Sequence, residues 1–157
     1  STIDLGIPTF KDLDYNNFNK TIANQKEDVV VFYGSKDKTL SLRPFLVTKK
    51  ASQLLKENPI KFYHYDCGRN SLPEDNSENT EFPLLRFYRG DKPQEPATFI
   101  NSFSIPNLME FFERYSYRKL DIPDYDPVKV ASDIKAEYEA TPKEEDEIIF
   151  RKTELEF

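Results

Sequence analysis

The sequence is poor in the residues that hold covalent or metal-based scaffolds together. Its 157 residues include one cysteine, one histidine and no tryptophan. The single cysteine, Cys67, excludes an intramolecular disulfide and a zinc site built on several thiolates. No stretch approaches the roughly 18 consecutive apolar residues that a membrane-spanning helix needs. The sequence therefore predicts no metal, no cofactor and no membrane span.

A dense basic patch is also missing. The chain carries 22 Lys and Arg against 28 Asp and Glu, a net charge of −6. Residues 121–157 hold 12 acidic and 5 basic side chains, whereas residues 1–120 hold 16 acidic and 17 basic ones. This pattern argues against nucleic acid or an anionic membrane surface as the main partner. It predicts one domain over residues 1–120, followed by an acidic extension over residues 121–157.

Aromatic residues are abundant, with 13 phenylalanines and 9 tyrosines to fill a core. Apolar residues spaced four apart predict a short helix in residues 15–25. The uninterrupted apolar run 29–33 is typical of a strand buried on both faces, as in a parallel sheet. Helical spacing follows over residues 40–57, with Pro44 inside the helix, and residues 60–67 form a second buried strand. Strand, helix and strand make a right-handed βαβ unit.

The second half of the body predicts an antiparallel hairpin and a closing helix. Residues 68–81 are polar and predict a loop. Residues 82–90 and 95–103 predict two strands joined by a turn at 90–93. Ser104 is placed to cap a helix whose wide apolar face would lie across the sheet.

This order of elements resembles the thioredoxin-like domains of the protein disulfide isomerase type, over roughly residues 8–118. The strand "VVVFYG" is similar to that family's strand ending in Phe-Tyr-Ala, and Pro44 to its helix-kinking proline. The run "FPLLRFYRG" matches the family's proline-led strand and its turn glycine. The resemblance implies an α/β, three-layer thioredoxin-like fold with a mixed sheet of about four strands, flanked by helices, plus a C-terminal helical extension. It also implies a cis peptide bond before Pro83.

The family's redox motif, two cysteines at the start of the kinked helix, is absent. Aligning on the strand end or on Pro44 places the two cysteines at slightly different positions, and neither alignment finds a thiol. We treat this stretch as a degenerate redox motif: Lys36, Asp37, Lys38, Thr39 and Leu40. Its charges fit either a solvated loop or a contact with an anion at the helix start.

The remaining chemically active side chains are isolated in the sequence. Cys67 ends the second strand and fits a small buried residue better than a reactive thiol. His64 lies in the middle of that strand, and Asp66, two residues on, is a weak partner for it. The sequence therefore predicts a hydrogen-bonded core histidine and no catalytic residue.

The acidic extension carries apolar residues that must be buried somewhere. A narrow stripe runs along a helix that Asp126 caps, and more apolar residues follow it. Either these side chains fold back on the domain or they bind another protein. We predict partner contacts for Val128, Ile134, Tyr138, Ile148, Ile149 and Phe150.

Together these features predict a non-catalytic protein that acts by binding other proteins. The favoured hypothesis is an accessory or structural subunit of a larger assembly, with a mitochondrial respiratory-type complex preferred and a cytoplasmic location left open. The alternative is a peptide- or client-binding domain like the non-catalytic domains of disulfide isomerases. The first ten residues lack the basic and apolar segments of a secretory signal, which argues against the alternative unless such a segment has been removed.

Overall fold

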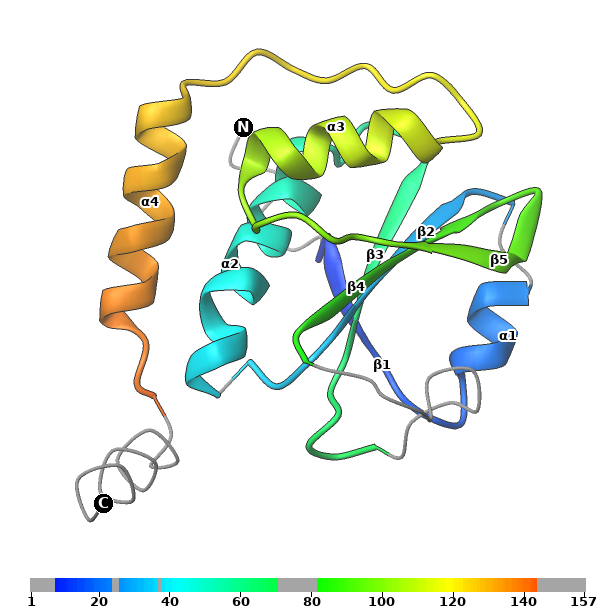
Figure 1. Cartoon of the computed structure of the whole chain (residues 1–157), viewed down its shortest axis with the longest axis horizontal. Coiled ribbons are helices and arrows are strands. Elements are labelled where there is room, and N and C mark those ends of the chain that lie inside the picture. The colour runs from blue at the N-terminus through cyan, green and yellow to red at the C-terminus, as the bar shows by residue number, and fades with distance from the viewer. Residues whose placement is uncertain (1–7, 24–25, 37, 71–81, 144–157) are drawn as a thin grey trace.

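The chain folds as a mixed β-sheet with helices on both faces (Figure 1). The computed structural model describes residues 8–23, 26–36, 38–70 and 82–143. No helix in these ranges is long and apolar enough to cross a membrane. The elements in chain order are β1 (Phe10–Leu13), α1 (Phe18–Ala23), β2 (Asp28–Tyr33), α2 (Thr39–Leu54), β3 (Ile60–Tyr65), β4 (Leu84–Arg89), β5 (Lys92–Thr98), α3 (Ile105–Tyr115) and α4 (Pro127–Ala140).

The sheet has five strands in the order β1-β3-β2-β4-β5. β1, β3 and β2 run parallel, while β4 is antiparallel to β2 and β5 is antiparallel to β4. The predicted α/β class and the βαβ unit formed by β2, α2 and β3 are confirmed. The edge strand β1 was not predicted, because its four residues include the exposed Lys11 and Asp12 and show no apolar run.

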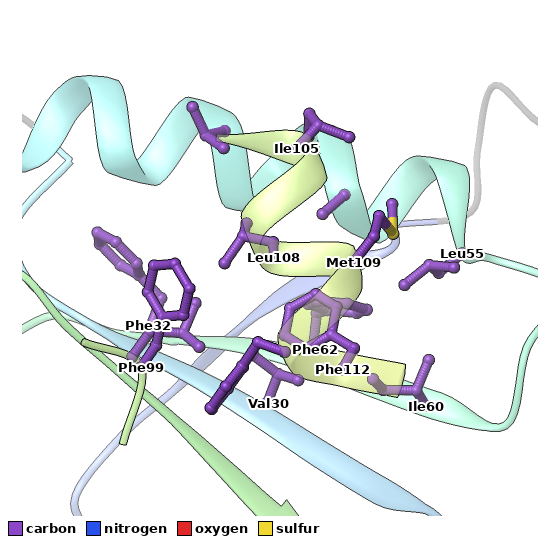
Figure 2. Packing of buried hydrophobic residues seen from close by; sticks show 14 of the residues in the cluster. Val30, Phe32, Leu55, Ile60, Phe62, Phe99, Ile105, Leu108, Met109 and Phe112 are labelled. Carbon is purple, nitrogen blue, oxygen red and sulfur yellow. The ribbon is translucent and has the colours of Figure 1, made fainter. Parts of the chain in front are cut away.

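The central strand β2 separates two clusters of buried side chains. All six of its residues are buried. Val30 and Phe32 contribute to the larger cluster, with residues of α2 and α3. Figure 2 shows this cluster, in which Phe62 of β3 meets Phe112 of α3 with ring centroids 5.4 Å apart. The alternate residues of β2 lie in a second cluster that includes Phe18 of α1. The sheet is thus the middle layer of three.

The predicted hairpin of β4 and β5 is present, but β5 starts three residues earlier in the chain than the sequence pattern predicted. It begins at Lys92 and ends at Thr98, and Phe99 belongs to the following loop. Pro93 and Pro96 both lie inside this strand. Proline cannot donate to a ladder, and an edge strand such as β5 is where a sheet tolerates it. Because proline is uncommon within strands, these two residues made the start of β5 hard to predict from the sequence.

Both C-terminal helices begin at the predicted caps. The hydroxyl of Ser104 accepts from the backbone N–H of Asn107 at 3.2 Å, at the start of α3. The carboxylate of Asp126 accepts from Val128 N at 3.0 Å, at the start of α4. The segment between these helices runs back along α3 and brings α4 beside α2 (Figure 1). Asn58, just after α2, holds this segment by two hydrogen bonds with the backbone of Asp121.

Candidate functional site

The degenerate redox motif lies at the edge of the sheet where β2 ends and α2 begins. Tyr33, the last residue of β2, pairs with Leu84 of β4 on one side and with Tyr65 of β3 on the other. Pro83 directly precedes Leu84, and the Phe82–Pro83 peptide bond is cis. The junction, the end of β3 and the proline-led strand therefore meet at one edge of the sheet.

The described junction residues present no nucleophilic sulfur. Lys36 is exposed, and Asp37 lies outside the described residues. Lys38 is the N-cap residue of α2 and gives the helix no side-chain cap. Thr39 is half-buried, and Leu40, in the first turn, is 80% exposed. An apolar side chain thus projects into solvent in the first turn of the helix.

Cys67 follows β3. Although Cys67 is far from the junction in sequence, it lies close to the backbone of Gly34 just after β2. Burial raises the pKa of the Cys67 thiol to about 12 from 9.0, the carboxylate of Asp66 adds to this rise, and a hydrogen bond with the backbone of Gly34 lowers the pKa. The sulfur also donates to the carbonyl of Tyr65 at 3.7 Å. A thiol with this pKa is neutral at physiological pH, and the thiolate is the form that attacks disulfides. Cys67 is therefore a poor nucleophile in the native fold.

His64 is a buried, hydrogen-bonded histidine of the core. The residue is 2% exposed, and its Nε2 lies 2.7 Å from the carbonyl oxygen of Gly34. That nitrogen must carry the hydrogen, because a carbonyl can only accept. Nδ1 lies 3.3 Å from the carboxylate of Asp12 on β1, so Asp66 is not the partner that the sequence suggested. His64 thus anchors the first carbonyl of the junction.

No metal-binding arrangement accompanies these side chains. In residues 8–23, 26–36, 38–70 and 82–143, no three His, Cys, Asp or Glu side chains gather as metal ligands would. With one cysteine in the whole chain, an intramolecular disulfide cannot form. This end of the sheet carries the exposed Leu40 in the first turn of α2 and the cis Phe82–Pro83 bond before β4.

The second candidate site is the helix α4. Ile134 is 7% exposed and Val130 is 9% exposed, and both belong to the main buried cluster, with Tyr138 packed against them. Val128 is 79% exposed. This part of the extension therefore folds back on the domain, which was one of the two alternatives. The residues Ile148, Ile149 and Phe150 lie outside the described residues, and their partner-binding role stays a prediction.

Charge pairs line one side of the contact between α2 and α4. Lys49 of α2 donates to the carboxylate of Glu137 at 2.8 Å, and Lys50 lies 3.9 Å from that of Asp133. Asp133 also pairs with Lys129 one turn earlier on α4, at 3.4 Å. All of these side chains are partly exposed, so each pair adds little stability alone. They lie on the flank of α4 next to the buried Val130 and Ile134, whose packing docks the helix.

A groove opens on the other side of α4, between this helix, α2 and the start of α3. Its volume is about 330 Å³, and its lining is mainly apolar. Arg43 and Lys135 lie among its lining residues, from α2 and α4 respectively. Sequence reasoning missed this groove because it depends on how α4 docks. The spacing of the stripe predicts an apolar face but not the neighbouring helix that meets it.

The fold is shared with domains of several solved structures. Full-length ERdj5 aligns with a TM-score of 0.61 and 18% identity, over 73% of this chain and 17% of that chain. The first thioredoxin domain of mouse protein disulfide-isomerase A4 aligns with a TM-score of 0.56 and 16% identity, over 73% of this chain and 81% of that domain. The zinc-bound form of human ERp44 aligns with a TM-score of 0.56 and 17% identity, over 67% of this chain and 30% of that one.

At these identities the likeness establishes the fold alone. No protein-family model and no curated protein matches the sequence. This chain covers less than a third of the ERp44 chain. The α/β arrangement of a mixed five-stranded sheet with flanking helices is a thioredoxin-like fold, here without the cysteine pair of the redox motif.

Proposed function

We propose that this chain is a non-catalytic thioredoxin-like protein that acts by binding other proteins, as an accessory or structural subunit of a larger assembly. One observation carries the proposal. The edge of the sheet keeps the strand β2, the helix α2 with Pro44 and the cis Phe82–Pro83 bond, while the junction between them has no cysteine. The structural elements around the junction are present while the reactive sulfur is absent, and this combination supports a role in binding other proteins.

The chemistry of the sole cysteine supports this proposal. Disulfide exchange by this fold needs a thiolate to attack and a second thiol to resolve the mixed disulfide. Cys67 has no second cysteine to resolve with, and its raised pKa keeps it protonated. The arrangement favours a binding role over an oxidoreductase.

The proposal is tested on the full chain carrying a small affinity tag in the cells from which it derives. Native size fractionation, followed by cross-linking and mass spectrometry, should find the chain in a particle much larger than a monomer, with a reproducible set of neighbours. Mitochondrial fractions, and respiratory-type complexes within them, are the first to examine. Migration only as a monomer would contradict the subunit role, and insulin reduction above background would contradict the non-catalytic role.

The alternative is a peptide- or client-binding domain of the disulfide isomerase type. The observation that favours it is Leu40, which is 80% exposed in the first turn of α2. Its fold likeness to domains of ERp44, ERdj5 and protein disulfide-isomerase A4 is a further reason to consider it. A reduced, unfolded model protein would then bind the full chain, and Leu40→Asp would weaken binding about tenfold. An unchanged affinity in Leu40→Asp would exclude this alternative.

A further inference from the structure

The charges on α4 are divided between its two flanks. Asp133 and Glu137 lie one turn apart on the flank that faces Lys50 and Lys49 of α2. The groove lies along the opposite flank, which includes Ala131 and Lys135. The carboxylates of Asp133 and Glu137 therefore pair with lysines of α2 on the flank of α4 that lies away from the groove.

The two cations of the groove have no carboxylate partner in the described part of the chain. Arg43 donates from Nη1 to the backbone carbonyl of Phe103 at 2.9 Å, a neutral acceptor. Lys135 takes part in no ion pair within these residues. Both side chains are exposed, and they come from different helices. The groove is thus left with two positive charges that no carboxylate of the described chain neutralises.

Between these cations the groove is apolar and elongated. Its lining includes Val47 of α2, Ile105 of α3 and Ile134 of α4. Along α4 it extends from Pro127 to Tyr138. Eleven residue steps at 1.5 Å of rise make about 16 Å, which equals about five residues of extended chain. A volume of about 330 Å³ lies at the small end for a ligand pocket, so it suits a few anchoring side chains of a chain that passes over it.

We propose that this groove, formed by α2, α3 and α4, docks a short acidic segment of a partner protein through its apolar side chains. The apolar side chains of the segment would contact Pro106, Ala131 and Tyr138, which line the groove and are exposed or half-buried. Its carboxylates would pair with Arg43 and Lys135. A basic segment would be repelled by the same two cations. The proposal rests on the proposed function and names the surface and the chemistry of the partner.

The test uses the purified full chain and a library of short random peptides displayed on phage. The selected peptides should combine Asp or Glu with Leu, Ile or Phe. Synthetic copies should bind the full chain at least about tenfold more tightly than the doubly reversed variant Arg43→Glu/Lys135→Glu. The variant Lys20→Glu/Lys92→Glu makes the same change in net charge at two exposed positions away from the groove and should bind like the parent.

A second variant fills the groove without changing its charge. Ala131 is exposed and lines the groove, so Ala131→Trp occupies the space with little effect on the core. It should also weaken binding at least about tenfold, with the unfolding midpoint unchanged. Selected peptides that are basic, or whose affinity is the same in both groove variants, would overturn the proposal, as would a selection that yields no binding peptide.

The same peptides separate a partner from the chain's own apolar residues. The full chain with Ile148→Asp, Ile149→Asp and Phe150→Asp should bind the peptides within about twofold of the parent. A gain of about tenfold or more in this variant would mean that the chain's own C-terminal residues occupy the groove, and it would overturn the assignment to a partner.

This test and the test of the proposed function fail in different ways. If the chain is found in a large particle whose composition is the same for the parent and the Arg43→Glu/Lys135→Glu variant, the groove proposal is wrong and the subunit role stands. If the chain is found only as a monomer, the subunit role is wrong.

Discussion

At the scale of single residues, Asp28 joins distant parts of the chain through its hydrogen bonds. Its side chain is 2% exposed at the start of β2. The carboxylate accepts from Gly90 N at 2.8 Å, from Ser116 Oγ at 3.0 Å and from Tyr117 N at 2.9 Å. These donors belong to the β4–β5 turn and to the segment that follows α3. One buried carboxylate therefore joins three parts of the chain that are distant in sequence.

We expect Asp28→Ala to lower the free energy of unfolding by about 2–4 kcal/mol. The substitution leaves three donors of partly buried hydrogen bonds without their acceptor, and such a donor costs free energy where water cannot replace that acceptor. Urea denaturation followed by circular dichroism measures the effect. The control is Asp124→Ala, at an exposed position of the segment before α4, which should change stability by less than about 0.5 kcal/mol. Equal effects of the two substitutions would contradict the role of Asp28.

The raised pKa of Cys67 predicts a thiol that reacts slowly in the native state. With a native pKa of about 12 against an ordinary 9.0, the folded chain keeps the thiol proton over a pH range in which the unfolded chain loses it. The stability that this difference contributes is present below pH 9 and is lost as pH rises toward 12. Iodoacetamide labelling at pH 8 should be about a hundred to a thousand times slower in the folded chain than in guanidinium. A native labelling rate that rises with an apparent pKa of 9 or below would contradict this expectation.

At the level of elements, α4 is the part whose behaviour the sequence left undecided. The stripe that the sequence predicted, Val128, Ala131, Ile134 and Tyr138, could have faced the domain or a partner. The structure buries Ile134 and half-buries Tyr138, but it leaves Val128 and Ala131 exposed and places Val130, which the stripe did not include, in the core. Since α4 packs on α2 and not on the sheet, it has fewer buried neighbours than the strands. Elements of this kind open at lower free energy than the core.

We therefore expect Ile134→Ala to loosen α4 without unfolding the sheet. Removal of a large buried aliphatic side chain costs about 2–4 kcal/mol where the helix stays docked. Hydrogen exchange should speed up at the amides of α4, while those of β2 keep their protection. Val128→Ala is the matched control on the same helix and should leave exchange unchanged. If both variants exchange alike along α4, the docking of this helix through Ile134 is wrong.

What the sequence could predict depended on patterns that are local. The buried run of β2, the helical spacing of α2 and the caps Ser104 and Asp126 each lie within a few residues, and all were found. The strand β1 was not predicted because it is a parallel edge strand of only four residues, two of them exposed and charged. Such a strand shows neither an apolar run nor a clear alternation of apolar and polar residues. The groove was not predicted because it forms only when α4 docks on α2. That docking places Arg43 and Lys135, which are 92 positions apart in the sequence, around the same groove, and no local pattern encodes it.

For the whole molecule, the absence of a second cysteine means that no disulfide within the chain holds the fold together. The buried cluster extends from Val30 of the central strand to Ile134 of the last described helix. No intramolecular disulfide closes any loop of this chain. Its stability should be independent of the redox state of its surroundings.

We expect the thermal unfolding midpoint of the full chain to be the same in dithiothreitol and in oxidised glutathione. Cys67 is half-buried with a raised pKa, so mixed disulfide formation should also be slow in the native state. Differential scanning calorimetry with mass spectrometry of the recovered protein measures both. Cys67→Ala provides the comparison chain. A midpoint that shifts with redox potential in the parent but not in Cys67→Ala would contradict this expectation.

The docking of α4 on α2 also has a consequence for the order of events during synthesis. The pair Lys49 and Glu137 is separated by 88 positions, and every strand of the sheet precedes α4 in the chain. A ribosome therefore delivers the whole sheet before it delivers the helix that forms the third wall of the groove. A protein that binds this groove therefore cannot bind a nascent chain that still lacks α4. It binds only chains whose sheet has already been synthesised.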